Sequence, residues 1–162
     1  MRATILVCTS LATAIATPAV ANDLSASLVG VWKIAEFSTK DLSTGATTQP
    51  YGERPSGRVI YTKGGHYVFF LVSGNQPKPT GPMSDADRVE LYKGLVAFSG
   101  TYRVEGNMIV PTSTDVAWVP GYQYAGATIE ITGNRLVTTS KPLKSPSSGR
   151  EIVITTVGER ME

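Results

Sequence analysis

The chain has 162 residues, with 15 basic and 13 acidic side chains and a formal charge of +2. Its 41% hydrophobic residues suffice for the core of one domain, and its 16 glycines and 10 prolines are too few for a low-complexity disordered chain. The weak, scattered charge argues against nucleic acid or an anionic membrane as partner. One histidine and one cysteine cannot build a His/Cys metal site, and we expect no metal or other cofactor.

The first 21 residues have the features of a secretory signal peptide. Arg2 precedes an apolar stretch over 5–15, and Ala19-Val20-Ala21 has the small-x-small pattern of a cleavage site. The stretch is shorter than the roughly 20 residues that span a bilayer, which disfavours a membrane anchor. We expect residues 1–21 to be removed on export, periplasmic or secreted, leaving 22–162 as one domain without cysteine or membrane segment.

Short runs rich in β-branched and aromatic residues follow, separated by turn residues. Eight of them predict strands: 28–38, 58–62, 66–73, 100–105, 108–118, 127–132, 135–140 and 150–157. Glycines in the turns at 63–65, 106–107 and 133–134 predict tight hairpins, because glycine tolerates the positive φ that they need. We predict an all-β, eight-stranded antiparallel up-and-down barrel, since closure hides every strand edge. A two-sheet sandwich is the alternative, but it usually has longer connections.

One segment between the third and fourth strands has helical rather than strand character. Ser84-Asp85-Ala86-Asp87 is typical of a helix start, and apolar residues recur at helical spacing to Val96, which predicts a short amphipathic helix over about 85–96. We interpret the two aspartates as caps that favour the helix dipole, rather than as a catalytic carboxylate pair. The proline-rich approach and the helix, 74–96, are a candidate lid for one barrel end.

Several motifs resemble a known family. Gly30-Val31-Trp32 is similar to the G-x-W signature of lipocalins and related calycins. A wider ordered set resembles the bacterial and fungal lipocalin-like domain family: 28–33, 51–57, 60–65, 99–104, 149–151 and 159–160. The resemblance implies a barrel that often binds small hydrophobic molecules, with Trp32 closing one end against Arg160. The central helix and the lack of a disulfide differ from secreted animal lipocalins, so their ligand-site residues are not carried over.

Aromatic residues and one carboxylate are the candidate lining of the interior. Strand alternation places Glu36 on the same face as Trp32, so an inward Trp32 predicts an inward Glu36, either wet at the mouth or paired with tyrosine hydroxyls. The remaining predicted cavity residues are Tyr61, Phe69, Tyr102, Trp118 and Tyr124. His66, beside a glycine turn, is interpreted as a solvated strand end rather than as a haem or metal ligand.

The function that this pattern favours is binding of a small hydrophobic or amphipathic molecule inside an exported, monomeric barrel. No phosphate loop, nucleophile elbow or zinc-protease motif occurs, and no catalytic residue is assigned. Two alternatives stay open: an isomerase- or cyclase-type enzyme that uses the cavity, and a barrel filled by side chains that serves as an interaction module.

Overall fold

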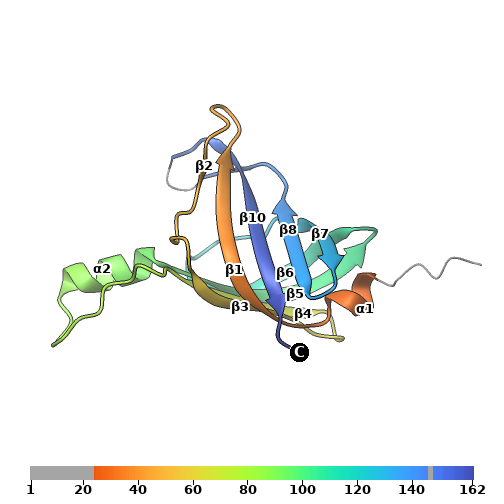
Figure 1. Cartoon of the computed structure of the whole chain (residues 1–162), viewed down its shortest axis with the longest axis horizontal. Coiled ribbons are helices and arrows are strands. Elements are labelled where there is room, and N and C mark those ends of the chain that lie inside the picture. Colours follow the sequence, from red (N-terminus) through yellow and green to blue (C-terminus); the bar gives the residue numbers. More distant parts are fainter. Residues whose placement is uncertain (1–23, 146–147) are drawn as a thin grey trace, which may run out of the picture.

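The structure is a computed structural model that describes residues 24–145 and 148–162, so the predicted signal peptide, 1–21, lies outside the described residues. The described elements are α1 (Leu24–Leu28), β1 (Gly30–Asp41), β2 (Thr47–Thr48), β3 (Ser56–Tyr61), β4 (His66–Val72), α2 (Asp85–Lys93), β5 (Leu95–Glu105), β6 (Met108–Ala117), β7 (Ala127–Thr132), β8 (Arg135–Ser140), β9 (Leu143–Lys144) and β10 (Glu151–Arg160). Figure 1 shows their arrangement.

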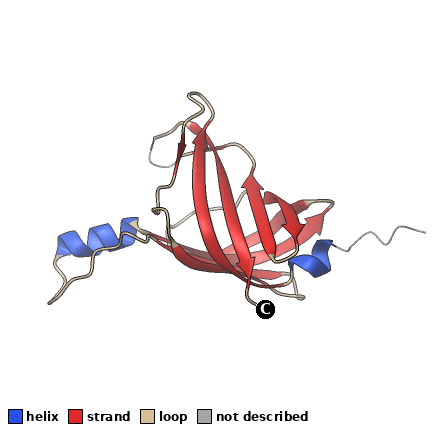
Figure 2. Ribbon diagram, in the orientation of Figure 1, coloured by secondary structure: helices blue, strands red, loops and turns tan. Residues whose placement is uncertain are grey.

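The predicted barrel is confirmed. Neighbouring strands pair antiparallel in the order β1-β3-β4-β5-β6-β7-β8-β10, and β10 pairs back onto β1 to close the sheet (Figure 2). The closing seam between β1 and β10 runs from Trp32 opposite Arg160 to Asp41 opposite Ile152. The two-residue strands β2 and β9 add only short pairings beside β1 and β10. The described residues therefore form one closed barrel of eight strands with a single interior.

Tight turns connect the hairpins where the sequence predicts them. Gly65, Gly106 and Gly133 have φ of 74°, 61° and 56°. Residues other than glycine rarely adopt this backbone region. The boundary of β5 differs from the prediction, because β5 begins at Leu95, where it pairs with Val72 of β4. The short helix α1, immediately before β1, has no counterpart among the predicted elements.

Helix α2 lies between the third and fourth barrel strands, β4 and β5, as predicted, and its start is a capping box. The Ser84 hydroxyl accepts a hydrogen bond from the Asp87 backbone N–H at 3.2 Å, and Asp87 accepts one from the Ser84 backbone N–H at 2.9 Å. The expected apolar face, however, is not buried: α2 contains no buried residue, and Val89 and Tyr92 are each 50% exposed. In Figure 1 the helix projects away from the barrel.

The barrel end formed by Trp32 and Arg160, here called the closed end, is tightly packed. Trp32 is fully buried, and its indole N–H donates a hydrogen bond of 2.9 Å to the Leu28 carbonyl. The Arg160 guanidinium lies 4.0 Å from the centre of the indole ring and donates to the carbonyls of Val29 and Ser27. The structure thus brings together the two residues that the family resemblance pairs.

Candidate ligand cavity

The barrel interior beyond the closed end holds a cavity of about 510 Å³. This volume lies within the roughly 300–1,000 Å³ that ligand pockets usually have. The cavity extends from Gly158 and Leu136, near the closed end, to Asp41 and Arg150, which mark what we call the mouth. A barrel filled by its own side chains, one of the alternatives above, does not fit an interior of this size.

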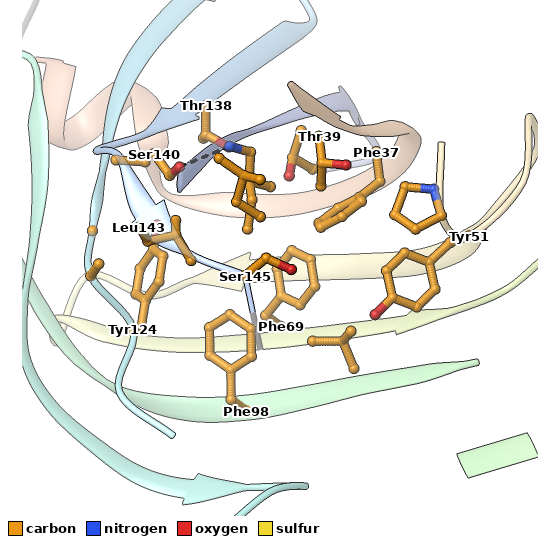
Figure 3. A pocket seen from close by; sticks show the side chains of 18 of the residues that line it. Phe37, Thr39, Tyr51, Phe69, Phe98, Tyr124, Thr138, Ser140, Leu143 and Ser145 are labelled. Atoms are coloured by element: carbon orange, nitrogen blue, oxygen red, sulfur yellow. Dashed lines mark hydrogen bonds between the residues drawn. The ribbon is translucent and has the colours of Figure 1, made fainter. Parts of the chain in front are cut away.

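One side of the cavity, the aromatic wall, is made of rings from β3, β4, β5 and the loop 118–126. Its members are Tyr61, Tyr67, Phe69, Phe98, Trp118, Tyr122 and Tyr124. Phe69 and Phe98 stack with a centroid distance of 4.9 Å and an interplanar angle of 16°, while Tyr124 lies 5.3 Å from Phe98 (Figure 3). These contacts hold the rings as one connected, largely apolar surface.

The loop 118–126 completes this wall where strand pairing is short. Strand β6 pairs with β7 only at Met108 opposite Thr128 and Ile109 opposite Ala127. Beyond these pairs the loop runs beside β6, and the Tyr124 backbone N–H donates to the Thr114 hydroxyl at 3.1 Å. Tertiary contacts of the loop, rather than a strand, therefore place Tyr122 and Tyr124 at the cavity.

The opposite side, the hydroxyl wall, comes from β1, β8 and β10. Its polar members are Thr39, Thr138, Ser140 and Thr156, with Ile152 and Ile154 between them. The Ser140 hydroxyl accepts a hydrogen bond from the Ile154 backbone N–H at 2.9 Å, and the Thr39 and Thr48 hydroxyls share one of 2.9 Å. Figure 3 shows Thr39, Thr138 and Ser140 across the cavity from Phe69 and Phe98. The cavity is therefore two-sided, with rings facing hydroxyls.

Among the described residues that line the cavity, only those at its mouth carry charged side chains. Arg150 and Asp41 form an ion pair of 2.7 Å, in which the Arg150 side chain is 58% exposed. The pKa of Asp41 is lowered, first by the hydrogen bond from the Ser43 hydroxyl and to a smaller degree by Arg150.

The phenols inside the cavity stay neutral. Burial raises the pKa of Tyr122 from 10.0 to about 12 and also raises the pKa values of Tyr61 and Tyr124 well above 10.0, with neighbouring tyrosines adding to the effect. At neutral pH the deep cavity therefore offers aromatic faces and neutral hydroxyl groups to an occupant.

Four of the predicted cavity residues line the cavity: Tyr61, Phe69, Trp118 and Tyr124. Tyr102 does not. Its ring packs behind the lining against Tyr61, at a centroid distance of 5.2 Å, and its hydroxyl donates to the Thr62 carbonyl at 3.1 Å. It is 8% exposed and belongs to the core.

The expectation that Glu36 faces inward is wrong. The pairing of β1 with β10 shifts register between Ile34 and Glu36, which is a β-bulge. A bulge adds one residue to the strand, so it reverses the alternation beyond it: Ile34 is fully buried, Glu36 is exposed, and Phe37 takes the inward position. Glu36 is absent from the cavity lining.

Sequence reasoning missed the hydroxyl wall and the inward Phe37. Strand alternation contained a usable signal for the first, because Leu136, Thr138 and Ser140 share one face of β8. The signal was easily passed over, since threonine is more often exposed than buried and does not by itself indicate an inward face. His66, at the start of β4, is exposed and is not part of the lining.

Fold and cavity together define a small antiparallel barrel with one internal, mostly apolar chamber. A family model for the lipocalin-like domain matches residues 29–157, and the chain belongs to this family. Searches against curated proteins and against solved structures gave no match. Within the described residues no helix has the length and apolar character needed to cross a membrane, and no cluster of three or more His, Cys, Asp or Glu side chains is arranged to hold a metal ion.

Proposed function

We propose that this protein binds a small, predominantly apolar molecule inside the barrel. The observation that carries the proposal is the chamber of about 510 Å³, whose rings and neutral hydroxyls leave no unpaired charge in its described lining. Binding sites for small molecules combine such apolar walls with a few polar groups. Membership of the lipocalin-like domain family is consistent with this role.

We further propose that the protein is exported and cleaved after Ala21, on the basis of the N-terminal sequence pattern. We also propose that it is monomeric, because the closed sheet leaves no long strand edge for pairing with another chain. Native mass spectrometry of the protein recovered from outside the cytoplasm tests this together with binding. The expected species is a monomer of residues 22–162 that carries a small-molecule adduct, released on denaturation. A species that retains residues 1–21, or a dimer, contradicts this part of the proposal.

Blocking the cavity tests the binding site itself. Thr138 and Thr139 are adjacent on β8, but only Thr138 lines the cavity. We expect Thr138→Trp to weaken binding of the neutral dye Nile red at least tenfold, about 1.4 kcal/mol, because the indole occupies the chamber. The matched control, Thr139→Trp, places the same ring on the outer face and leaves the dissociation constant within about twofold.

Fluorescence titration measures both constants, and circular dichroism checks that both variants fold. Absence of saturable dye binding to the unchanged protein, or equal affinity of the two variants, refutes binding in this cavity.

A further inference from the structure

We infer that the ligand is a neutral, flat ring compound with a carbonyl or hydroxyl oxygen, and that Thr138 and Thr156 bind this oxygen while the ring packs against Phe69 and Phe98. The inference rests on the proposed function, because it specifies the occupant of the same cavity.

Thr138 and Thr156 form an unpaired hydroxyl couple inside the barrel. They are directly opposite each other in the pairing of β8 with β10, and both line the cavity. Thr156 is only 8% exposed. Among the described residues neither side chain has a hydrogen-bond partner, whereas the neighbouring Ser140 and Thr39 have theirs.

A hydroxyl without a partner in the protein forms its hydrogen bonds with water or with a bound molecule that reaches it. In the described residues, every side-chain oxygen that solvent cannot reach has a hydrogen-bond partner. Since the Thr156 hydroxyl has no such partner, it must be accessible from the cavity. Two adjacent hydroxyls can donate to one ligand oxygen or exchange hydrogen bonds with it. This couple therefore fits one carbonyl or hydroxyl group of an occupant.

The shape of the occupant follows from the opposite wall. Strand order places β8 and β10 across the barrel from β4 and β5, which carry Phe69 and Phe98. These two rings stack on each other, with centroids 4.9 Å apart and planes at 16°, so each covers one face of the other at the cavity. A flat ring can pack edge-to-face or offset-stacked against the parts of the pair that stay free, whereas a flexible chain gains no comparable geometry.

The charge of the occupant follows from the electrostatics. In the described lining the only groups charged at neutral pH, Asp41 and Arg150, neutralise each other at the mouth. A charged group placed between the hydroxyl couple and the rings would lose its hydration without gaining a counter-ion. The site therefore favours a neutral molecule.

Three probes of one ring frame test the inference: 9-fluorenone, fluorene, which lacks the oxygen, and 9-fluorenone-2-carboxylate, which adds a charge. Calorimetry or fluorescence quenching gives the dissociation constants. We expect fluorenone to bind about fivefold more tightly than fluorene, and more tightly than the carboxylate. The double variant Thr138→Val/Thr156→Val, which keeps the side-chain shape, should remove the preference for fluorenone and keep the affinity for fluorene.

The outward couple on the same strands supplies the control. Thr139 and Thr155 are also opposite each other, but neither lines the cavity, so Thr139→Val/Thr155→Val should preserve the preference. Any one of four results overturns the inference: equal binding of fluorenone and fluorene, tighter binding of the carboxylate, a preference for fluorenone that survives in Thr138→Val/Thr156→Val, or no binding of any of the three probes. Nile red binding separates the two proposals, because its persistence in any of these cases leaves the proposed function intact.

Discussion

Gly30, Trp32 and Arg160 close one end of the barrel through contacts that depend on each residue type. Gly30 has φ +143°, and a Cβ atom there would lie 2.5 Å from the Glu162 carbonyl oxygen and 2.9 Å from the Arg160 guanidinium. The absence of a side chain thus lets the arginine reach both the indole ring and the carbonyls of the preceding segment. The G-x-W pattern is explained by this packing.

Replacing Arg160 by methionine tests the closed end. The variant keeps an apolar stem but loses the contact with the Trp32 ring and the hydrogen bonds to the carbonyls of Val29 and Ser27. We expect the free energy of unfolding to fall by about 2–4 kcal/mol, measured by urea denaturation. The control Arg135→Met, at an exposed position of β8, should change it by no more than about 0.5 kcal/mol. Equal effects of the two variants would contradict a structural role for Arg160.

Among the elements, α2 shows how local signals and packing can diverge. Its capping box and its charge pairs, Arg88 with Asp85 and Lys93 with Glu90, are local and support the helix. None of its residues is buried, and no residue of α2 lines the cavity. The lid hypothesis for 74–96 therefore finds no support in the position of the helix.

Shortening this segment tests the conclusion. We expect replacement of residues 77–90 by a short Gly-Ser linker to leave the melting temperature within a few degrees and the Nile red dissociation rate unchanged, because the replaced residues bury no core side chain. The design keeps Tyr92, whose hydroxyl donates to the Trp118 carbonyl at 3.0 Å. Stopped-flow fluorescence measures the rate, and a several-fold faster dissociation would restore the lid hypothesis.

At the scale of the whole molecule, the barrel wall is not equally strong all the way round. The seam of β1 with β10 is paired along nearly the full length of both strands, whereas β6 and β7 pair at Met108 and Ile109 alone. The loop 118–126 covers the rest of that side through side-chain contacts. Local opening should therefore cost least at this loop.

Hydrogen exchange followed by mass spectrometry measures this difference. We expect peptides that cover 118–126 to exchange at least tenfold faster than those that cover β10, because the loop amides open without unfolding the barrel. Peptides that cover β5, which is paired on both sides, serve as the control and should exchange as slowly as β10. Exchange at one common rate in all three regions would show that the wall opens only as a unit.

The amino-acid sequence by itself determined the eight strands, the glycine turns and the helix start, because these depend on local preferences: alternation, positive φ and capping. The family motifs likewise pointed to the Trp32–Arg160 pair. The side that each residue faces was decided only by the tertiary structure. A single bulge in β1 turned Glu36 outward and Phe37 inward, and tertiary packing put Tyr102 in the core and left the apolar side chains of α2 unburied. The hydroxyl couple of Thr138 and Thr156 also exists only because β8 and β10, separate in the chain, pair in one register. Local preferences determine where strands, turns and helices form. The register of the strands and the closure of the barrel depend on contacts between residues far apart in the chain, and they determine which side chains line the cavity.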